Sequence, residues 1–230
     1  TLTDYSVDLT GSSSDVAAAL DGTFADTYTG DISLNNAHNL TQLKTINAAT
    51  TGTITLTDYS VDLSGSTADV KAALDGTFAD TYTGNVTLGD ADDAEIAATD
   101  ISTIAGDTNG TVTVTNDIII TGTSAAIATA VGNVDTFSGT PTANLGNAHT
   151  LDQLKTINNA VSGQLTLTDY DVDLSGSTAD IKAALAGDFA AAYTGDVTLG
   201  DDDDVEIAAT DISTIAGDTS GDVTCLLYTS

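Results

Sequence analysis

Residues 53–110 read TITLTDYSVDLSGSTADVKAALDGTFADTYTGNVTLGDADDAEIAATDISTIAGDTNG, and most of the remaining chain copies this stretch. TLTDYSVDL begins at Thr1 and again at Thr55, and the variant TLTDYDVDL begins at Thr166. A diverged copy opens with TVTVTNDIIITGTSAAIATAV at Thr111, between the second and third of these starts. Self-similarity at a fixed period of this size predicts a repeat array rather than an ordinary globular domain.

The chain divides into four predicted repeat units followed by a remnant. They span residues 1–52, 53–110, 111–163 (the diverged unit) and 164–221, and residues 222–230 hold the truncated start of a fifth unit. The first and third units share QLKTIN, whereas the second and fourth share EIAATDISTIAGDT. The true period is therefore a pair of units, as the interval from Thr55 to Thr166 shows.

The C-terminal residues depart from the repeat pattern. Asp222 begins the expected strand opening, but CLLYTS then follows from Cys225 to the end. CLLYTS resembles one reading frame of a common sequencing adapter, so we expect an artefactual tail on a metagenomic fragment; a divergent strand end is the alternative. Without Cys225 the repeats contain no cysteine, which excludes disulfides and thiolate metal sites.

Each unit contains two strand–turn–helix modules. Apolar residues alternate with threonines at Ile54, Thr55 and Leu56, which is the pattern of a half-buried strand. Val61 and Leu63 are expected to face inward in the extended piece that follows. Three capping patterns of Ser-x-x-Asp type predict helix starts; they are Ser12–Asp15, Ser66–Asp69 and Ser177–Asp180. Three apolar stripes follow, at Val16, Ala19 and Leu20, at Val70, Ala73 and Leu74, and at Ile181, Ala184 and Leu185.

The order of these elements predicts the fold class. Strands and helices that alternate over such short connections imply parallel strands with right-handed crossovers. The predicted fold is an α/β repeat, namely a β/α solenoid of parallel strands and short helices. It is similar in outline to the arc or superhelix of leucine-rich-repeat proteins, although the LxxLxLxxN signature is missing. One phenylalanine per unit is expected to fill the gap between modules; the four are Phe24, Phe78, Phe137 and Phe189.

The charge excludes two classes of partner. Acidic residues outnumber basic ones by 34 to 4, and the formal net charge is −30. A nucleic-acid-binding protein needs a basic surface, and this sequence has none. Anionic membranes repel such a chain, and no apolar run approaches the roughly 20 residues that span a bilayer. We therefore expect no nucleic acid partner and no membrane insertion.

The acidic turns of the second and fourth units are the candidate metal ligands. Clustered carboxylates supply the hard oxygen atoms that Ca²⁺ prefers. Their spacing is not that of an EF-hand, and helix capping with surface solvation is the competing interpretation. The candidate ligands are Asp90, Asp92, Asp93 and Glu95 in one copy, and Asp201, Asp202, Asp203, Asp204 and Glu206 in the other.

No pattern in the sequence predicts an enzyme. The two histidines, His38 and His149, occupy the same repeat position in successive pairs of units, so we expect turn or capping residues rather than catalysts. No phosphate-binding loop, zinc-ligand spacing or nucleophile with a neighbouring base is present. Threonine ranks are a further feature, since Thr53, Thr55 and Thr57 could align with Thr111, Thr113 and Thr115 on one sheet face. Such ranks resemble ice-binding faces, but ordinary β-propensity explains them as well.

The blocks TLTDYSVDLSGSTADVKAAL and EIAATDISTIAGDT resemble the acidic, Thr/Asp/Ala/Gly-rich arrays of very large secreted or cell-surface proteins of marine bacteria, which include adhesin-like proteins. The resemblance implies an extracellular or surface location and a stalk or spacer role, often with calcium stiffening, between flanking repeats of the same parent chain. The alternative is a repeat surface that binds ice, a mineral or a glycan through its threonine or aspartate ranks. Either function leaves the chain without an active site of its own.

Overall fold

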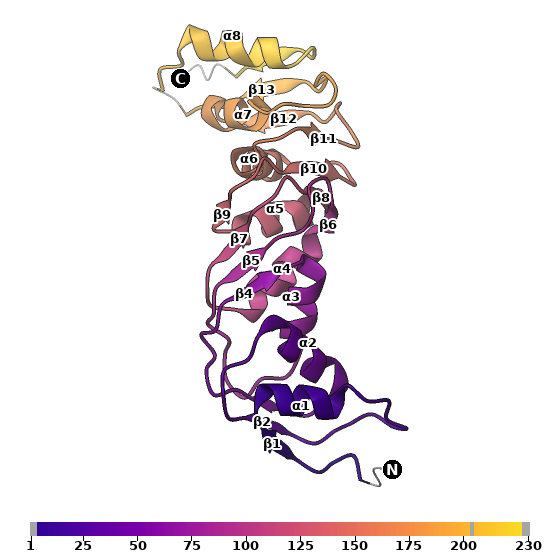
Figure 1. Cartoon of the computed structure of the whole chain (residues 1–230). Helices are drawn as coiled ribbons and strands as arrows, with labels where there is room; N and C mark the ends of the chain where they lie inside the picture. Colours follow the sequence, from indigo (N-terminus) through magenta and orange to yellow (C-terminus); the bar gives the residue numbers. More distant parts are fainter. Residues whose placement is uncertain (1–3, 203–204, 227–230) are drawn as a thin grey trace. The chain divides into compact units, whose positions relative to one another are not determined.

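The computed structural model describes residues 4–202 and 205–226, which form an α/β fold of short strands and helices (Figure 1). In this part of the chain the helices are α1 (Ser13–Leu20), α2 (Leu40–Ala49), α3 (Thr67–Leu74), α4 (Ala98–Asp107), α5 (Ser124–Asn133), α6 (Leu151–Ala160), α7 (Thr178–Leu185) and α8 (Ala209–Asp218). The strands of the first half are β1 (Leu9–Gly11), β2 (Ile32–Leu34), β3 (Ile54–Thr55), β4 (Leu63–Gly65), β5 (Val86–Leu88), β6 (Glu95–Ala97) and β7 (Val112–Val114). Those of the second half are β8 (Ile119–Gly122), β9 (Thr136–Phe137), β10 (Thr142–Leu145), β11 (Leu165–Thr166), β12 (Leu174–Gly176), β13 (Val197–Leu199) and β14 (Val223–Cys225).

All described strand pairs are parallel, as the sequence predicts. The four sheets have the strand orders β1-β2-β3, β4-β5-β7-β9, β11-β10-β8-β6 and β12-β13-β14. Short connections between parallel strands leave room only for one helix or loop per crossover. The helices pack against the strand before them and the strand after them, as α3 does on β4 and β5.

The chain forms two compact units that interleave along the sequence. Unit 1 contains the residues up to Asp90, Asp100–Thr115 and Val134–Ser138, and it holds the first two of these sheets. Unit 2 contains Ala91–Thr99, Asn116–Asn133 and the residues from Gly139 onward, with the other two sheets. These units do not follow the four repeat boundaries, which stay a prediction.

Period-2 alternation builds the core, as expected. Ile54 and Leu56 are buried and Thr55 between them is exposed, while Leu63 of β4 is 1% exposed. Val61 is only half-buried, so the expectation that it faces inward is wrong. Its carbonyl oxygen accepts a hydrogen bond from the hydroxyl group of Tyr82. Burying each large apolar side chain contributes about 1.5–3 kcal/mol, which has to offset the ordering of the short segments around it.

The predicted helix starts are confirmed at the hydroxyl residues. Ser12, Ser66 and Ser177 are the N-caps of α1, α3 and α7, and each accepts the amide N–H of the aspartate three residues later. Two further helices begin with full capping boxes, Asn39 with Gln42 and Thr150 with Gln153, which sequence reasoning missed. The signal was present, because Asn or Thr followed three residues later by Gln is the capping-box pattern.

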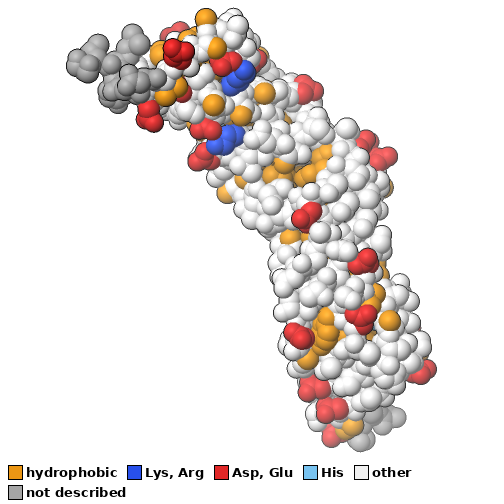
Figure 2. All heavy atoms as spheres, turned by 90° about the vertical axis from the view of Figure 1, so that its left-hand side faces the viewer, with side chains coloured by type: hydrophobic (Ala, Val, Ile, Leu, Met, Phe, Trp, Pro, Cys, Tyr) orange, Lys and Arg blue, Asp and Glu red, His pale blue; other side chains and the backbone are white. Residues whose placement is uncertain are grey.

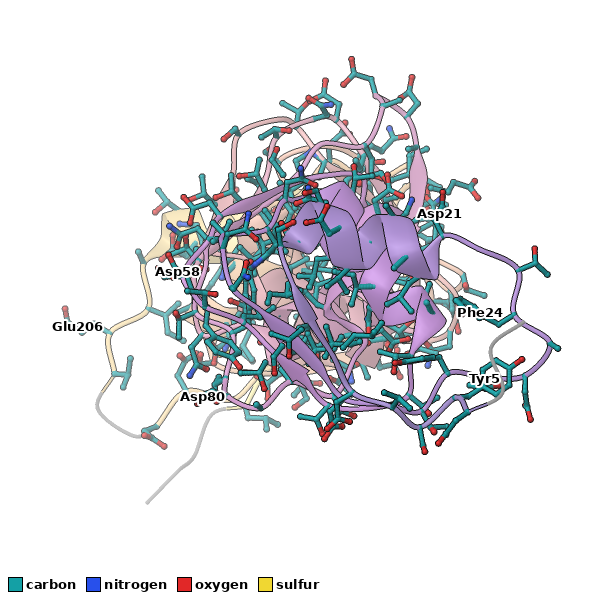
Figure 3. All side chains as sticks on the ribbon, turned by 60° about the horizontal axis from the view of Figure 1, so that its bottom comes forward. Tyr5, Asp21, Phe24, Asp58, Asp80 and Glu206 are labelled. Atoms are coloured by element: carbon teal, nitrogen blue, oxygen red, sulfur yellow. The ribbon has the colours of Figure 1, made fainter. Side chains whose placement is uncertain are left out.

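One expectation about packing needs correction. Ala73 and Ala184 are fully buried, but the matching Ala19 of α1 is exposed, since no described helix precedes α1. The four phenylalanines are half-buried, and their role in filling the gap between modules stays a prediction. Phe24 lies edge-on to Tyr5 at 6.3 Å between ring centroids, at one margin of unit 1 (Figure 3). No described helix is both long and apolar enough to cross a membrane.

Candidate functional site

The first acidic residue of each predicted metal turn caps a helix in the preceding module. Asp90 accepts the backbone N–H of Thr67 at 3.0 and 3.1 Å and its hydroxyl at 2.5 Å. Asp201 makes the same three contacts with Thr178, at 3.1, 3.2 and 2.5 Å. Thr67 and Thr178 are the first residues of α3 and α7, where backbone N–H groups have no partner within the helix. Both carboxylates are therefore committed to a cap.

The first and third repeat units make this cap with a neutral side chain. Asn36 Oδ1 accepts the N–H of Ser13 at 2.7 Å, and Asn147 Oδ1 accepts that of Ser124 at 2.7 Å. All four caps join residues 23 apart in the sequence. Because an amide serves this position as well as a carboxylate does, the position itself does not require charge. This equivalence favours the capping interpretation for Asp90 and Asp201.

The remaining candidate ligands in the 90–95 turn lie on the surface, and their surroundings differ from one another. Asp92 Oδ1 lies 3.3 Å from the amide nitrogen of Asp117, and Glu95 is exposed in β6. Asp93 has a φ of 61°, a left-handed conformation that Asp and Asn tolerate in turns. Among the described residues, no group of three or more His, Cys, Asp or Glu side chains is placed to hold a metal ion.

The second turn is only partly described. Asp202 and Glu206 are exposed, and Glu206 projects from its loop away from the ribbon (Figure 3). Asp203 and Asp204 lie outside the described residues. Calcium binding by these turns therefore stays a prediction, and the described carboxylates supply no preformed cage for it.

All four lysines form ion pairs between consecutive helices. The pairs are Lys44–Asp69 at 2.5 Å, Lys71–Asp100 at 2.5 Å, Lys155–Asp180 at 2.8 Å and Lys182–Asp211 at 2.5 Å. They join α2 to α3 and α3 to α4 in unit 1, and α6 to α7 and α7 to α8 in unit 2. Every lysine of the chain thus takes part in a contact between two helices.

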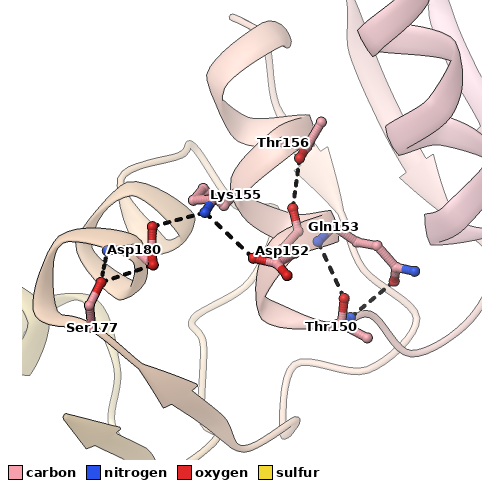
Figure 4. Close-up of polar contacts among 7 residues, drawn as sticks. All are labelled: Thr150, Asp152, Gln153, Lys155, Thr156, Ser177 and Asp180. Carbon is pink, nitrogen blue, oxygen red and sulfur yellow. Dashed lines mark hydrogen bonds and ion pairs between the residues drawn. The ribbon is translucent and has the colours of Figure 1, made fainter. Parts of the chain in front are cut away.

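Figure 4 shows the α6–α7 pair in its setting. Lys155 bridges Asp180 of α7 and Asp152 of its own helix, and Ser177 donates to the carboxylate of Asp180 at 2.9 Å. The Lys155 ammonium, followed by the Ser177 hydroxyl, lowers the pKa of Asp180. The hydrogen bond to Asp180 in turn raises the pKa of Lys155. The sequence predicts Asp69 and Asp180 only as third-position capping partners, and it does not predict their bonds to a lysine of the preceding helix.

The two histidines are buried links between modules, not the turn or capping residues that the sequence predicts. His38 Nε2 lies 3.0 Å from Tyr82 Oη, and His149 Nε2 lies 2.9 Å from Tyr193 Oη. His38 and His149 are 5% and 4% exposed, and the residue after each of them is the helix cap.

The bonding pattern fixes the tautomer of these histidines. Tyr82 donates its hydroxyl proton to the carbonyl oxygen of Val61 at 2.5 Å, so His38 Nε2 is the donor toward Tyr82 Oη. Nδ1 is then unprotonated, and it has no hydrogen-bond partner among the described residues. Burial lowers the pKa of His38, and a weaker effect of Asp58 opposes it. A histidine held neutral, donating to a tyrosine that is itself engaged, is a structural bond and not an acid–base pair.

A ladder of Asp and Asn side chains, which the sequence reasoning missed, explains many of the other acidic residues. Asp8 Oδ1 accepts the N–H of Asp31 at 3.0 Å, and Asp31 Oδ1 accepts that of Thr53 at 2.7 Å. The same arrangement recurs along Asp62, Asn85 and Thr111, and along Asp173, Asp196 and Asp222. Each step saturates the amide that precedes the neighbouring strand. The spacing of 23 to 26 residues between Asx positions was the available signal.

Several hydroxyl groups of the predicted threonine ranks donate hydrogen bonds to the neighbouring strands. Thr57 Oγ1 donates to the carbonyl oxygen of Leu34 at 2.6 Å, and Thr115 Oγ1 donates to that of Leu88 at 3.1 Å. Thr111 Oγ1 donates to Asn85 at 2.9 Å. These hydroxyls hold neighbouring strands together and are not available as a regular outer rank. The strands are also shorter than predicted, since β3 contains only Ile54–Thr55.

Two open hollows in unit 1 carry no recognisable chemistry. The larger, about 490 Å³, lies between α2 and the loop after α1, and Phe24 and Tyr28 line it. The equivalent hollow of the next repeat unit, about 410 Å³, contains Asp107, whose pKa burial raises, with a smaller effect of Asp75. Neither of these two hollows is lined by histidine or cysteine, whereas an open hollow of about 550 Å³ in unit 2 is lined by His149 and Asp180. On the face in Figure 2, acidic side chains are scattered and do not form one patch.

Comparison with protein-family models, with curated proteins and with solved structures finds no match for this chain.

Proposed function

We propose that this chain is a structural or adhesive repeat segment, a stalk or spacer in a large extracellular or cell-surface protein. In the proposed architecture the modules stack in sequence order as a β/α solenoid, with flanking repeats of the same parent chain. The observation that carries the proposal is the use of polar side chains. Lysines, buried histidines, Asx ladders and helix caps all bond to an adjacent module, at sequence separations between 22 and 44 residues.

Such contacts are suited to a scaffold and not to a reaction site. The polar contacts named above recur from module to module, so among the described residues they do not gather a unique set of groups at one position. Quasi-one-dimensional arrays derive their stability from nearest-neighbour interfaces of this kind. The surplus of negative charge keeps such a segment soluble and extended, particularly where salt screens its self-repulsion.

The test is a lengthened chain studied by small-angle X-ray scattering. A second copy of residues 111–221 inserted after Gly221 recreates the Gly110–Thr111 junction and adds one further pair of repeat units. For a linear stack the radius of gyration grows nearly in proportion to length, by roughly half. A compact globule lengthened to the same extent grows by only about 16%. The smaller increase would refute the spacer proposal.

Calcium stiffening is tested separately by thermal unfolding of residues 1–221 in EDTA, in millimolar Ca²⁺ and in Mg²⁺. A Ca²⁺-specific rise in Tm would assign a binding role to the exposed carboxylates of the acidic turns, because Mg²⁺ screens charge without filling a large flexible oxygen site. Equal effects of both ions would indicate screening of the −30 charge.

One observation favours a second candidate, a repeat surface that binds ice, a mineral or a glycan. Strand register aligns single hydroxyl residues across β4-β5-β7-β9; they are Ser64, Thr87, Thr113 and Thr136. Neighbouring strands are about 4.7–4.9 Å apart, so these side chains form a regular row. Replacing Thr87 and Thr113 together by valine should abolish adsorption or thermal hysteresis if this row binds. Unchanged adsorption would exclude it.

A further inference from the structure

The modules built on α3 and α7 each receive the same set of contacts from the module before them. For α3 the contacts are Lys44 Nζ to Asp69 at 2.5 Å, Asn47 Nδ2 to the carbonyl oxygen of Ala72 at 2.9 Å, and His38 Nε2 to Tyr82 Oη at 3.0 Å. For α7 they are Lys155 to Asp180 at 2.8 Å, Asn158 to Ala183 at 2.8 Å, and His149 to Tyr193 at 2.9 Å. Both sets come from a segment with the sequence NAHxLxQLKTIN.

Two glycines complete each interface. Leu40 of α2 lies over Gly65, so that a Cβ there would be 2.4 Å from the leucine Cδ2, and Leu151 lies over Gly176 at 2.5 Å. Asn47 contacts Gly76 in the same way, since a Cβ would be 1.9 Å from its Oδ1. The face of α3 is thus shaped for a leucine, a lysine and an asparagine at fixed positions of one helix.

The module built on α1 presents this face without its partner. Its sequence has Gly11, Asp15, Gly22 and Tyr28 at the positions that match Gly65, Asp69, Gly76 and Tyr82 of the α3 module. Among the described residues no lysine pairs with Asp15, and no side chain comes within 4 Å of a Cβ built at Gly22. Tyr28 bonds to the carbonyl oxygen of Val7, as Tyr82 does to Val61, yet no described histidine bonds to Tyr28. Ala19 is exposed where Ala73 is buried.

We propose that this face, defined by Gly11, Asp15, Ala19, Gly22 and Tyr28, binds a helix of the LxQLKTIN type from another repeat of the same kind. The inference rests on the repeat organisation proposed above and adds the identity of the partner. Charge complementarity selects this helix, because its lysine would meet Asp15 in a chain with only four cations.

The other helix type of this chain is a poorer fit. In α8 the positions that match Leu40 and Lys44 are Ala209 and Ser213. An alanine leaves the space over Gly11 unfilled, and a serine leaves Asp15 without a counter-ion. The face therefore discriminates between the two helix types of its own repeat family.

The experiment extends the full chain at its N-terminus. A second copy of residues 31–54 fused directly ahead of Thr1 recreates the sequence of the Ile54–Thr55 junction and supplies new copies of α2 and His38. We expect a higher Tm than that of the chain without the extension. Asp15→Asn should lower the Tm of the extended chain and leave that of the original chain nearly unchanged.

Histidine titration by NMR reports docking independently of stability. The third histidine should titrate well below the ordinary value of about 6.5 if it is buried against Tyr28, as the other two histidines are. A third histidine that titrates at about 6.5 would show that the appended segment hangs free, and that outcome would overturn the proposal.

Two matched extensions test the specificity. The copy of residues 31–54 with Lys44→Met and Asn47→Ala should recover only part of the gain in Tm. A copy of residues 85–112, which carries the α4 sequence at the same junction, should give a smaller gain than the 31–54 copy. An equal or larger gain from residues 85–112 would refute the stated partner. Failure of every extension, with normal growth of the lengthened chain in scattering, would overturn the docking and leave the spacer function standing.

Discussion

The joint between α1 and α2 and the joint between α2 and α3 adjoin each other in unit 1 but use different chemistry. At the first joint, Ser13 is 1% exposed, and its hydroxyl lies 3.0 Å from both Gln42 Oε1 and the carbonyl oxygen of Ala37. At the second, Lys44 and Asp69 pair while their side chains remain 42% and 46% exposed. We call these the amide joint and the ion-pair joint.

Unit 2 repeats the comparison with a natural substitution. Ser124 forms the same amide joint between α5 and α6, with Gln153 and Ala148 as partners. The diverged helix α5 has alanines, Ala126 and Ala128, where α3 has Asp69 and Lys71. The amide joint thus persists where the charged residues are absent. This difference indicates that buried uncharged bonds hold successive modules together, and that exposed ion pairs mainly determine which helix packs next to which.

Both kinds of joint rest on a close backbone approach, and breaking it should give the largest effect. A Cβ on Gly30 would lie 2.3 Å from the carbonyl oxygen of Val7, at the joint between α1 and α2. A Cβ on Gly195 would lie 2.1 Å from the carbonyl oxygen of Val172, at the joint between α7 and α8 that an ion pair also spans. Gly195→Ala should therefore lower the free energy of unfolding by about 1–3 kcal/mol or more, as overpacking does. Urea unfolding followed by circular dichroism measures the change.

The control for this prediction is a helical glycine with open space around it. No described atom lies within 4 Å of a Cβ built on Gly217 in α8. Gly217→Ala should stabilise the chain by roughly 0.5–1 kcal/mol, because alanine has less backbone freedom to lose. Equal losses from the two substitutions would show that the backbone contact is not a constraint.

The amide joint should be the next most sensitive feature. Ser124→Ala removes a buried hydroxyl that donates to Gln153 and to the carbonyl oxygen of Ala148. We expect a loss of about 0.5–1.5 kcal/mol in the free energy of unfolding. Thr129→Ala, on the exposed side of α5, is the comparison and should be close to neutral. A loss at Ser124 no larger than that at Thr129 would remove the argument for the amide joint.

The buried histidines predict a fall in stability as the pH drops below the ordinary histidine pKa of about 6.5. Burial lowers the pKa of His38 and His149, so the unfolded chain binds protons that the folded chain does not. The stabilisation is complete above the unfolded pKa of about 6.5 and is lost as the pH falls toward the lower folded pKa. Each histidine contributes a slope of up to about 1.4 kcal/mol per pH unit.

The double substitution His38→Gln and His149→Gln isolates this effect. It should flatten the dependence of Tm on pH across the range in which histidine titrates, whereas titration of the aspartates at lower pH should remain. Asp58 and Asp169 are the acidic groups whose charge acts on the two imidazoles, and each opposes the effect of burial. A slope unchanged by the double substitution would place the acid sensitivity elsewhere.

The sequence predicts those features that depend on local spacing. Alternation at Ile54 and Thr55 and the hydroxyl at Ser66 were sufficient to locate a strand and a helix start. The role of Asp90 could not be read in this way, because it depends on an amide 23 residues away. Whether a carboxylate binds a cation or caps a helix is decided by tertiary contact.

Identical sequences in two places show the same limit for strands. The tripeptide EIA forms β6 at Glu95–Ala97, where β8 pairs with it, but residues 206–208 are not a strand. The local pattern is the same, so pairing with a neighbouring strand supplies the difference. The same limit applies to the four repeat boundaries, because contacts between modules define the compact units and the periodicity of the chain does not.

The ion-pair joint should give the smallest effect, and its salt dependence is the informative quantity. Lys155→Met removes the charge that Asp152 and Asp180 share, and it makes the net charge of −30 more negative by one. Exposed pairs of this kind contribute little to stability. We expect a small decrease in Tm at about 0.1 M salt that disappears at about 1 M, where the screening length is about 3 Å. The same measurement on Asp180→Asn, and on the double variant, separates the pair from the general repulsion among carboxylates. If the decrease persists at about 1 M salt, the direct hydrogen bond from Lys155 to Asp180 stabilises the joint, because methionine keeps most of the apolar stem of lysine and salt screens only the longer-range attraction. The distinction between the two joints is then not one of charge screening.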